Sequence, residues 1–293
     1  MTAGKIGVVL GSTRGIGRAL VERLARHWGD EGLVYLTARS EADGARVATE
    51  LRSAGIDARH LVFDLADPDS PGRLAAALCG RHGGLDVLVQ NGAAMPRPDR
   101  TAAEDARPMS EANSHGTLRV LRAFAPLMRE NGRMLVVASG FGVLRSLPEH
   151  VADRFRAAGD DPDAINAIMD DYVAAAEGGN AAAQGWPDWV NYPSKVGQVA
   201  LTRAFARAAR AHGRLARGVL VNSANPGVTR TDATLGFMDT VFKHSRVQEP
   251  DEAAEGLMAA LILEPGSSEP NGELIDHGRI LAFDFGLDGG ATA

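Results

Sequence analysis

Residues 6–17 are Ile6-Gly7-Val8-Val9-Leu10-Gly11-Ser12-Thr13-Arg14-Gly15-Ile16-Gly17, and this stretch decides the fold of the 293-residue chain. It begins with a short apolar run, which is typical of a buried strand. Three glycines then precede an amphipathic segment. Glycines permit a sharp turn and a close approach of the backbone to a phosphate group. The first amides of a following helix would face that phosphate with a partial positive charge. The stretch therefore predicts a strand, a phosphate-binding loop and a helix.

Short apolar runs alternate with amphipathic ones along most of the chain. Strands are predicted over residues 6–10, 33–36, 59–63, 85–89, 134–138 and 219–222. Helices are predicted over residues 16–27, 42–53, 71–79, 111–130 and 196–211. This alternation is typical of βαβ units, and right-handed crossovers place helices on both faces of a parallel sheet. We therefore expect a Rossmann-type α/β fold with a doubly wound parallel sheet.

The alternation breaks once, between Phe141 and Trp189, where no strand is predicted. Residues 149–158 and 162–176 have the pattern of helices within this stretch. Because the strand pattern resumes afterwards, residues from about 145 to 188 form a helical insertion rather than a separate domain. One domain is expected over residues 1–286, and the Gly/Ala-rich residues 287–293 are expected to be a flexible tail.

Composition narrows the classes of partner and the location. The net charge is −6, which disfavours a nucleic-acid-binding or anionic-membrane surface. Cys79 is the only cysteine, so no internal disulfide can form, as is usual in a reducing compartment. The first apolar run is too short for a signal-peptide core, and no run approaches the roughly 18 residues of a membrane span. No histidine pair has metal-ligand spacing, so no metal site is expected. We expect a cytoplasmic protein.

The glycine loop and the end of the second predicted strand indicate the cofactor. The loop spacing is Gly-x-x-x-Gly-x-Gly, and between strand and helix it predicts dinucleotide binding through Gly11, Thr13, Gly15, Ile16 and Gly17. An acid after the second strand would bond the ribose 2′-hydroxyl of NAD, but residues 33–40 contain none.

Two arginines stand in its place. Arg39 follows the second predicted strand, and Arg14 lies in the loop. Two guanidinium groups suit the 2′-phosphate of NADPH, although both could instead be solvated surface residues. NADPH is therefore the expected cofactor.

Two further strand ends are candidates for cofactor contacts. Asp64 and Leu65 follow the third predicted strand, where the carboxylate could contact adenine or could cap the next turn. Asn91 and Gly92 end the fourth predicted strand, at the edge where ligands bind in open α/β sheets.

The segment Asn191-Tyr192-Pro193-Ser194-Lys195 indicates the chemistry. An ammonium group beside a phenol stabilises the phenolate, so it lowers the phenol pKa from its usual value of about 10. A tyrosine–lysine pair in the first turn of a helix suits proton transfer to a carbonyl oxygen.

Together these stretches resemble the short-chain dehydrogenase/reductase family, in particular its monomeric carbonyl reductase branch. The resemblance runs from Lys5 to about Phe285. It implies that residues 226–229, Pro226, Gly227, Val228 and Thr229, lie along the nicotinamide. It also implies that the insertion covers the surface through which other relatives oligomerise, so we expect a monomer, with a homodimer as the alternative.

The resemblance also implies catalytic residues. Asn113 matches the family's asparagine, which holds a water in a proton relay, often where its helix bends. Ser139 matches the serine, whose hydroxyl bonds the substrate carbonyl. Lys195 matches the lysine, which bonds the nicotinamide ribose and lowers the phenol pKa.

The tyrosine of the family precedes the lysine by four residues, and here that position holds Asn191. Its neighbour Tyr192 lies three residues before Lys195. Adjacent residues on a helix differ by about 100°, so Tyr192 would need a frayed first turn to swing inward. In that arrangement Asn191 would be the N-cap. An asparagine amide could bond a carbonyl but could not deliver a proton.

Three hypotheses follow. The first is NADPH-dependent reduction of a small ketone or aldehyde, with Asn113, Ser139, Tyr192 and Lys195 as catalytic residues. The second is a non-redox cyclase, dehydratase or isomerase on the same scaffold, because Asn191 holds the tyrosine position. The third is a cofactor-binding regulatory or structural protein without turnover.

Overall fold

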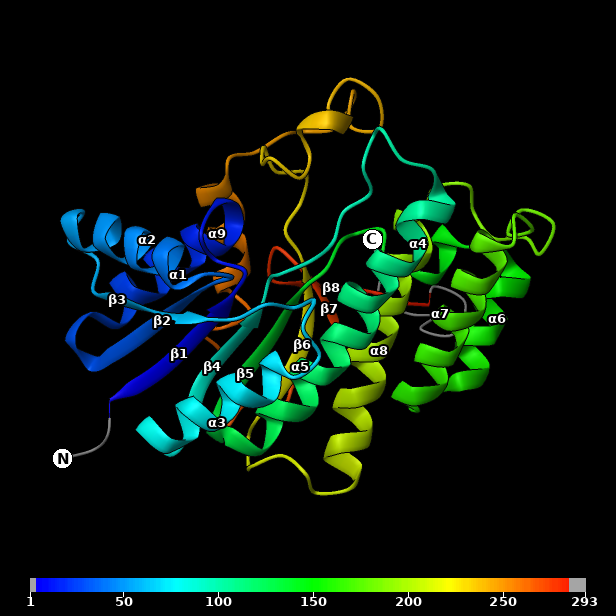
Figure 1. The fold of residues 1–293 in the computed structure, drawn as a ribbon. Helices are drawn as coiled ribbons and strands as arrows, with labels where there is room; N and C mark the ends of the chain where they lie inside the picture. Colours follow the sequence, from blue (N-terminus) through cyan, green and yellow to red (C-terminus); the bar gives the residue numbers. More distant parts are fainter. Residues whose placement is uncertain (1–3, 285–293) are drawn as a thin grey trace.

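Eight strands form one sheet in the part of the chain that the structure, a computed structural model, describes, residues 4–284. Their order across the sheet is β3-β2-β1-β4-β5-β6-β7-β8 (Figure 1). The strands are β1 (Lys5–Leu10), β2 (Gly32–Ala38), β3 (Ala58–Val62), β4 (Leu85–Gln90), β5 (Met128–Val137), β6 (Leu220–Asn225), β7 (Leu274–Asp276) and β8 (Arg279–Leu281). The predicted flexible tail, residues 287–293, lies outside the described residues.

Strands β1 to β7 are parallel, and the strand order reverses at β1, which pairs with β2 on one side and β4 on the other. A crevice outside the carboxyl ends of the strands forms at such a reversal. Strand β8 runs antiparallel to β7, because the chain turns back through His277 and Gly278, both with positive φ.

The helices lie on both faces of the sheet, as Figure 1 shows. The bounds are α1 (Gly15–Trp28), α2 (Glu41–Ser53), α3 (Ser70–His82), α4 (Ala102–Ser110), α5 (Thr117–Phe124), α6 (Glu149–Ala158), α7 (Pro162–Glu177), α8 (Asn191–Ala211) and α9 (Pro250–Met258). Helices α1, α2 and α9 pack on one face. Helices α3, α5 and α8 pack on the other, and α6 and α7 lie outside α8. The doubly wound fold is confirmed.

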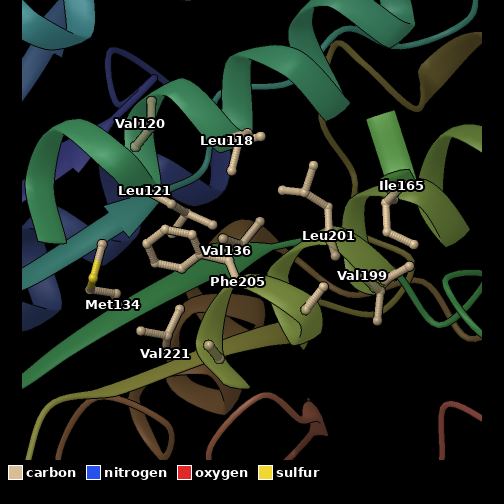
Figure 2. Close-up of a cluster of buried hydrophobic side chains, with 14 of the residues drawn as sticks. Leu118, Val120, Leu121, Met134, Val136, Ile165, Val199, Leu201, Phe205 and Val221 are labelled. Atoms are coloured by element: carbon tan, nitrogen blue, oxygen red, sulfur yellow. The ribbon is translucent and has the colours of Figure 1, made fainter. Parts of the chain in front are cut away.

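Alternating side chains of the strands build two cores. Val8 of β1 belongs to the core under α5 and α8, whereas Val9 belongs to the core under α1 and α2. Figure 2 shows Leu121 of α5 and Phe205 of α8 over Val136 of β5. Burying each such side chain contributes about 1.5–3 kcal/mol. This packing fixes α8, which carries the segment 191–195, against the sheet.

The helix predicted over residues 111–130 was wrong at both ends. Its N-terminus lies earlier, because Thr101 and Glu104 form a capping box that starts α4. Residues 111–116 form a π-helical turn before α5. At the other end β5 already begins at Met128, and Asn131, with φ of 61°, lies at an irregularity of its pairing with β4 rather than at a helix end.

The two helices predicted between β5 and β6 are confirmed as α6 and α7. The Asp161 side chain accepts hydrogen bonds from the amides of Asp163 and Ala164, which fixes the start of α7. Helix α7 packs against both α4 and α8. The insertion therefore packs against α8, the helix that carries the candidate catalytic residues Tyr192 and Lys195.

Candidate active site

The glycine loop between β1 and α1 has the close backbone contacts that a phosphate-binding loop needs. A Cβ atom on Gly11, where φ is 69°, would lie 2.7 Å from the Cα of Gly92. A Cβ on Gly17 would lie 2.4 Å from the carbonyl oxygen of Gly11. Neither position accepts a side chain without backbone movement. The first turn of α1 contains no acidic residue, so its free amides can face an anion.

Hydrogen bonds hold this loop against its neighbouring strands. The Gly11 amide donates to Thr37 Oγ1 at 2.9 Å, and the Thr37 amide donates to Ser12 Oγ at 2.8 Å. Asn91 Nδ2 donates to the Gly11 carbonyl oxygen at 2.7 Å. The predicted residue Asn91 therefore shapes the loop from the end of β4. The role of Ser12 and Thr37 could not be predicted, since it depends on contact between separate strands.

The two arginines predicted to bind the 2′-phosphate are exposed at the carboxyl edge of the sheet. Arg14 forms an ion pair with Asp232 at 3.2 Å, and Arg39 directly follows β2. The close-packed glycines, the free helix amides and these two cations suit a dinucleotide with a 2′-phosphate. Predicted residues Thr13, Gly15 and Ile16 lie in the same loop or the first turn of α1.

Asp64 and Leu65 follow β3 at the same edge. Asp64 Oδ1 accepts a hydrogen bond from the Ala66 amide at 3.0 Å, so the carboxylate does stabilise the turn. Leu65 packs toward Gly92 and Gly116, where added Cβ atoms would approach it to 3.6 and 3.0 Å. Both residues therefore follow the carboxyl end of β3, at the edge of the sheet where the glycine loop follows β1.

The segment Pro226–Thr229 leaves the carboxyl end of β6 in a tightly bonded turn. Gly227 has φ of 72°, and the Val228 carbonyl oxygen accepts a hydrogen bond from the Gln248 amide at 2.9 Å. Asn225 Oδ1 accepts from the Gly140 amide at 2.8 Å and from the Gly227 amide at 3.1 Å. Asn225 thus ties the turn after β5 to the turn after β6, and sequence reasoning missed it.

Asn113 lies fully buried in the π-helical turn between α4 and α5. Its Oδ1 accepts from the Ala94 amide at 2.9 Å, and its Nδ2 donates to the Ala94 carbonyl at 2.8 Å. Nδ2 also lies 2.9 Å from Ser194 Oγ of α8. The side chain therefore joins the segment after β4 to the start of α8. Ser194 was not predicted, although it adjoins Lys195 in the sequence.

Ser139 is half-buried at the carboxyl end of β5. Its Oγ accepts a hydrogen bond from the Phe141 amide at 3.2 Å. That bond orients the hydroxyl and leaves its proton available for a substrate oxygen.

Lys195 is a buried cation rather than a surface lysine, with 4% of the residue exposed. Nζ donates to Gln198 Oε1 at 3.1 Å, and Gln198 Nε2 lies 3.4 Å from Thr117 Oγ1. Burial lowers the pKa of Lys195 from 10.5 to about 8. Gln198 was missed in the sequence, although its spacing of three residues from Lys195 places it on the same helix face.

Asn191 is the first residue of α8 and is only 2% exposed. It does not cap the helix, because Val190 is the N-cap and no side chain caps it. Among the described residues, Asn191 Oδ1 has no hydrogen-bond partner. Helical geometry already at residue 191 also means that the first turn is not frayed.

Tyr192 is half-buried in an aromatic cluster. Its ring meets those of Phe141 and Trp189 edge to face, with centroids 5.3 and 5.2 Å away. Phe237 and Phe242, from the segment between β6 and α9, contact Trp189 and Phe141. No hydrogen bond within residues 4–284 joins Tyr192 to Lys195 or Ser139. The structure brings Asn113 into contact with Ser194 of α8, but it does not pair Tyr192 with Lys195.

Within residues 4–284, no group of three or more His, Cys, Asp or Glu side chains is arranged to hold a metal ion. No helix in that range combines the length and apolarity needed to span a membrane.

Comparison with known proteins places this geometry in a family. A short chain dehydrogenase family profile matches residues 5–150. The chain is 31% identical over 275 residues to carbonyl reductase (NADPH) 3 of Rattus norvegicus, covering 92% of this chain and 95% of that protein. It is 29% identical over 279 residues to carbonyl reductase (NADPH) 1 of the same organism, covering 94% and 97%.

A solved structure supports the fold. Salutaridine reductase from Papaver somniferum superposes with a TM-score of 0.77 at 19% identity, covering 92% of this chain and 99% of that one. Strand order, glycine loop and near full-length similarity agree. The chain belongs to the short-chain dehydrogenase/reductase family of oxidoreductases.

Proposed function

We propose that this chain reduces a ketone or aldehyde of a small organic molecule to an alcohol with NADPH. The observation that carries the proposal is Lys195, a buried ammonium group without a carboxylate partner among the described residues. A cation that burial destabilises in this way is typical of a functional site. The relatives with near full-length similarity are named NADPH carbonyl reductases, which supports the same activity.

The cofactor would lie along the carboxyl edge of the sheet. The glycine loop and the first amides of α1 would hold the pyrophosphate, and Arg14 and Arg39 the 2′-phosphate. Asp64, Leu65, Asn91 and Gly92 would border the adenosine half, and residues 226–229 the nicotinamide. When bound, the cofactor supplies the hydride.

Ser139 would bond the substrate oxygen through its hydroxyl. That bond stabilises the negative charge that develops on the oxygen as the carbonyl carbon is reduced. Asn113 would connect the site to solvent through a water. Two residues of α8 are candidates for the proton source, Tyr192 and Lys195.

The test is NADPH consumption against a panel of aldehydes, aliphatic ketones, aromatic ketones and quinones. We expect turnover with at least one class, and a loss of about 10²-fold or more in Ser139→Ala with NADPH affinity retained. If NADPH binds and no carbonyl compound is reduced, the proposal fails. The non-redox hypothesis, with Asn191 polarising a carbonyl, would then take its place.

We expect the protein to act as a cytoplasmic monomer. Helix α7 packs against α4, so the insertion covers a helix that would otherwise present an open face. Light scattering should give a mass near 30.8 kDa. Twice that mass would identify a homodimer.

A further inference from the structure

Asn191 and Lys195 lie four residues apart on α8, so their side chains share one face of the helix. Both are buried, at 2% and 4% exposure. Asn191 Oδ1 is an acceptor without a partner in residues 4–284. Lys195 Nζ has three donors, and Gln198 Oε1 is its one hydrogen-bond partner in the same range.

Such an arrangement is costly unless a third group completes it. A buried acceptor without a donor costs about 1–3 kcal/mol, and a buried ammonium group costs more. One hydroxyl-bearing molecule can satisfy both, since it donates to Asn191 Oδ1 and accepts from Lys195 Nζ. Water has this combination of donor and acceptor and is small enough for a buried polar site.

We infer that Asn191 and Lys195 hold a water that delivers the proton to the substrate oxygen, with Lys195 as its source. This inference rests on the proposed reductase function. It assigns Asn191 a positioning role and removes Tyr192 from the proton transfer.

The position of Tyr192 supports this assignment. It is adjacent to Asn191 on a regular helical turn, so its direction differs by about 100° from that of Asn191. Its ring is committed to edge-to-face contacts with Phe141 and Trp189. Tyr192 therefore serves as a wall of the aromatic cluster.

The step balances in atoms and electrons. The carbonyl carbon receives the hydride that reduced nicotinamide supplies, and the C=O π electrons move to oxygen. That oxygen takes a proton from the held water, and the water takes one from the Lys195 ammonium. An alcohol and a neutral amine result, and solvent returns a proton to the amine.

The surroundings of Lys195 suit a proton source. Burial is the one cause that lowers its pKa, and no ion pair joins Lys195 to a described acidic side chain of the elements packed on α8, which are α4, α5, α7, β6, residues 111–116 and residues 144–146. The nearby polar partners are the neutral side chains of Gln198 and Thr117. An ammonium with a pKa of about 8 gives up its proton far more readily near neutral pH than one at 10.5.

The chain has three lysines, Lys5, Lys195 and Lys243, which permits direct titration. Lysine labelled with ¹³C at Cε gives three NMR signals, and Lys5→Arg and Lys243→Arg assign them. Two quantities are compared: the titration midpoint of Lys195 and the midpoint of the pH dependence of the reduction rate. We expect both to fall near pH 8, with the rate decreasing above it.

Asn191→Asp keeps the shape and adds a negative charge, so both midpoints should rise together by about one pH unit or more. Asn191→Leu removes the acceptor, and we expect the rate to fall about 10²-fold. The exposed Asn180→Asp controls for added charge and should move neither midpoint. Circular dichroism verifies the fold of each variant.

Tyr192→Phe decides between the two proton sources. The inference requires this variant to keep most of its rate and the same pH profile. Two results together would overturn this inference but not the proposed function. Tyr192→Phe would lose reduction, and Asn191→Asp would change neither the titration midpoint of Lys195 nor the pH dependence of the rate. Absence of reduction by the unaltered chain would instead overturn the proposed function.

Discussion

Lys195 Nζ lies 3.1 Å from Oε1 of Gln198, three residues further along α8, and both side chains are buried. Among the described residues this is the only hydrogen bond of the ammonium group. Gln198 is in turn 3.4 Å from Thr117 Oγ1 at the start of α5. The neutral side chains of Gln198 and Thr117 therefore hold the ammonium group of Lys195 in place, although burial disfavours its positive charge.

Replacement of Gln198 should shift the pKa of Lys195 in a direction set by the new side chain. Gln198→Met removes the acceptor and lowers that pKa further, whereas Gln198→Glu adds an opposite charge and raises it. The free energy of unfolding should fall by about 1–3 kcal/mol in the methionine variant. NMR titration of the lysines and urea denaturation measure both. Equal midpoints in the two variants would contradict the contact.

Lys195→Met should separate activity from stability. We expect the reduction rate to fall about 10²-fold or more, because the proton source is lost. Stability at pH 7 should be at least that of the unaltered chain, since an apolar side chain removes a buried charge. Urea denaturation at pH 7 provides the comparison. A variant that is both inactive and strongly destabilised would point to a structural role.

The same lysine gives stability a pH dependence with a defined sign. Its folded-state pKa is about 8 and its ordinary value is 10.5, so between them the unfolded chain holds the proton and the folded chain does not. The contribution of Lys195 to the free energy of unfolding therefore rises with pH from about 8 to about 10.5. The free energy of unfolding of Lys195→Met minus that of the unaltered chain isolates this contribution. That difference should become smaller as the pH rises from about 8 to about 10.5.

Much of the fold could be predicted because it depends on local patterns. The apolar run 6–10, the glycine loop and the two insertion helices are each encoded within a few neighbouring residues. The helix over 111–130 failed where local pattern and tertiary contact disagree. Apolar residues continue past Phe124, but from Met128 onward they pair with β4 as a strand. The capping box at Thr101 and Glu104 was a readable signal for the true helix start.

The candidate site was less predictable, since its hydrogen bonds join distant segments. Asn225 contacts Gly140, and Asn113 contacts Ser194, across 85 and 81 residues. Motifs located Asn113, Ser139 and Lys195 but could not show that Asn191 is buried, with an Oδ1 that has no hydrogen-bond partner in residues 4–284. The direction of the Tyr192 ring depends on Phe141, which comes from another element.

Gly11→Ala should weaken NADPH binding beyond its effect on stability. Gly11 and Gly83 have φ of 69° and 71°, but an added Cβ meets the Gly92 backbone only at Gly11, while Gly83 has open space. Both alanine variants should lose about 1 kcal/mol of stability from the left-handed backbone. Gly11→Ala should lose more, because its Cβ would lie 2.7 Å from the Cα of Gly92. Calorimetry should show an NADPH Kd raised at least 10-fold in Gly11→Ala alone. An equal NADPH Kd in the two variants would show that the glycine loop does not bind the cofactor.

Arg14→Ala and Arg39→Ala should discriminate between the two dinucleotides. Each loses a guanidinium for the 2′-phosphate, so the NADPH Kd should rise about 10- to 100-fold with little change for NADH. Asp232→Asn frees Arg14 from its ion pair and should leave NADPH binding as tight or tighter. Fluorescence titration gives the constants. Parallel changes for NADPH and NADH would assign the arginines another role.

We propose that this scaffold still transfers hydride although asparagine holds the position, four residues before Lys195, that tyrosine holds in the family. The most direct measurement uses NADPH deuterated at the transferable position with a reducible carbonyl substrate, and mass spectrometry of the product. We predict an alcohol with one deuterium on the former carbonyl carbon. Bound NADPH that stays unoxidised, with an unlabelled or rearranged product, would contradict it.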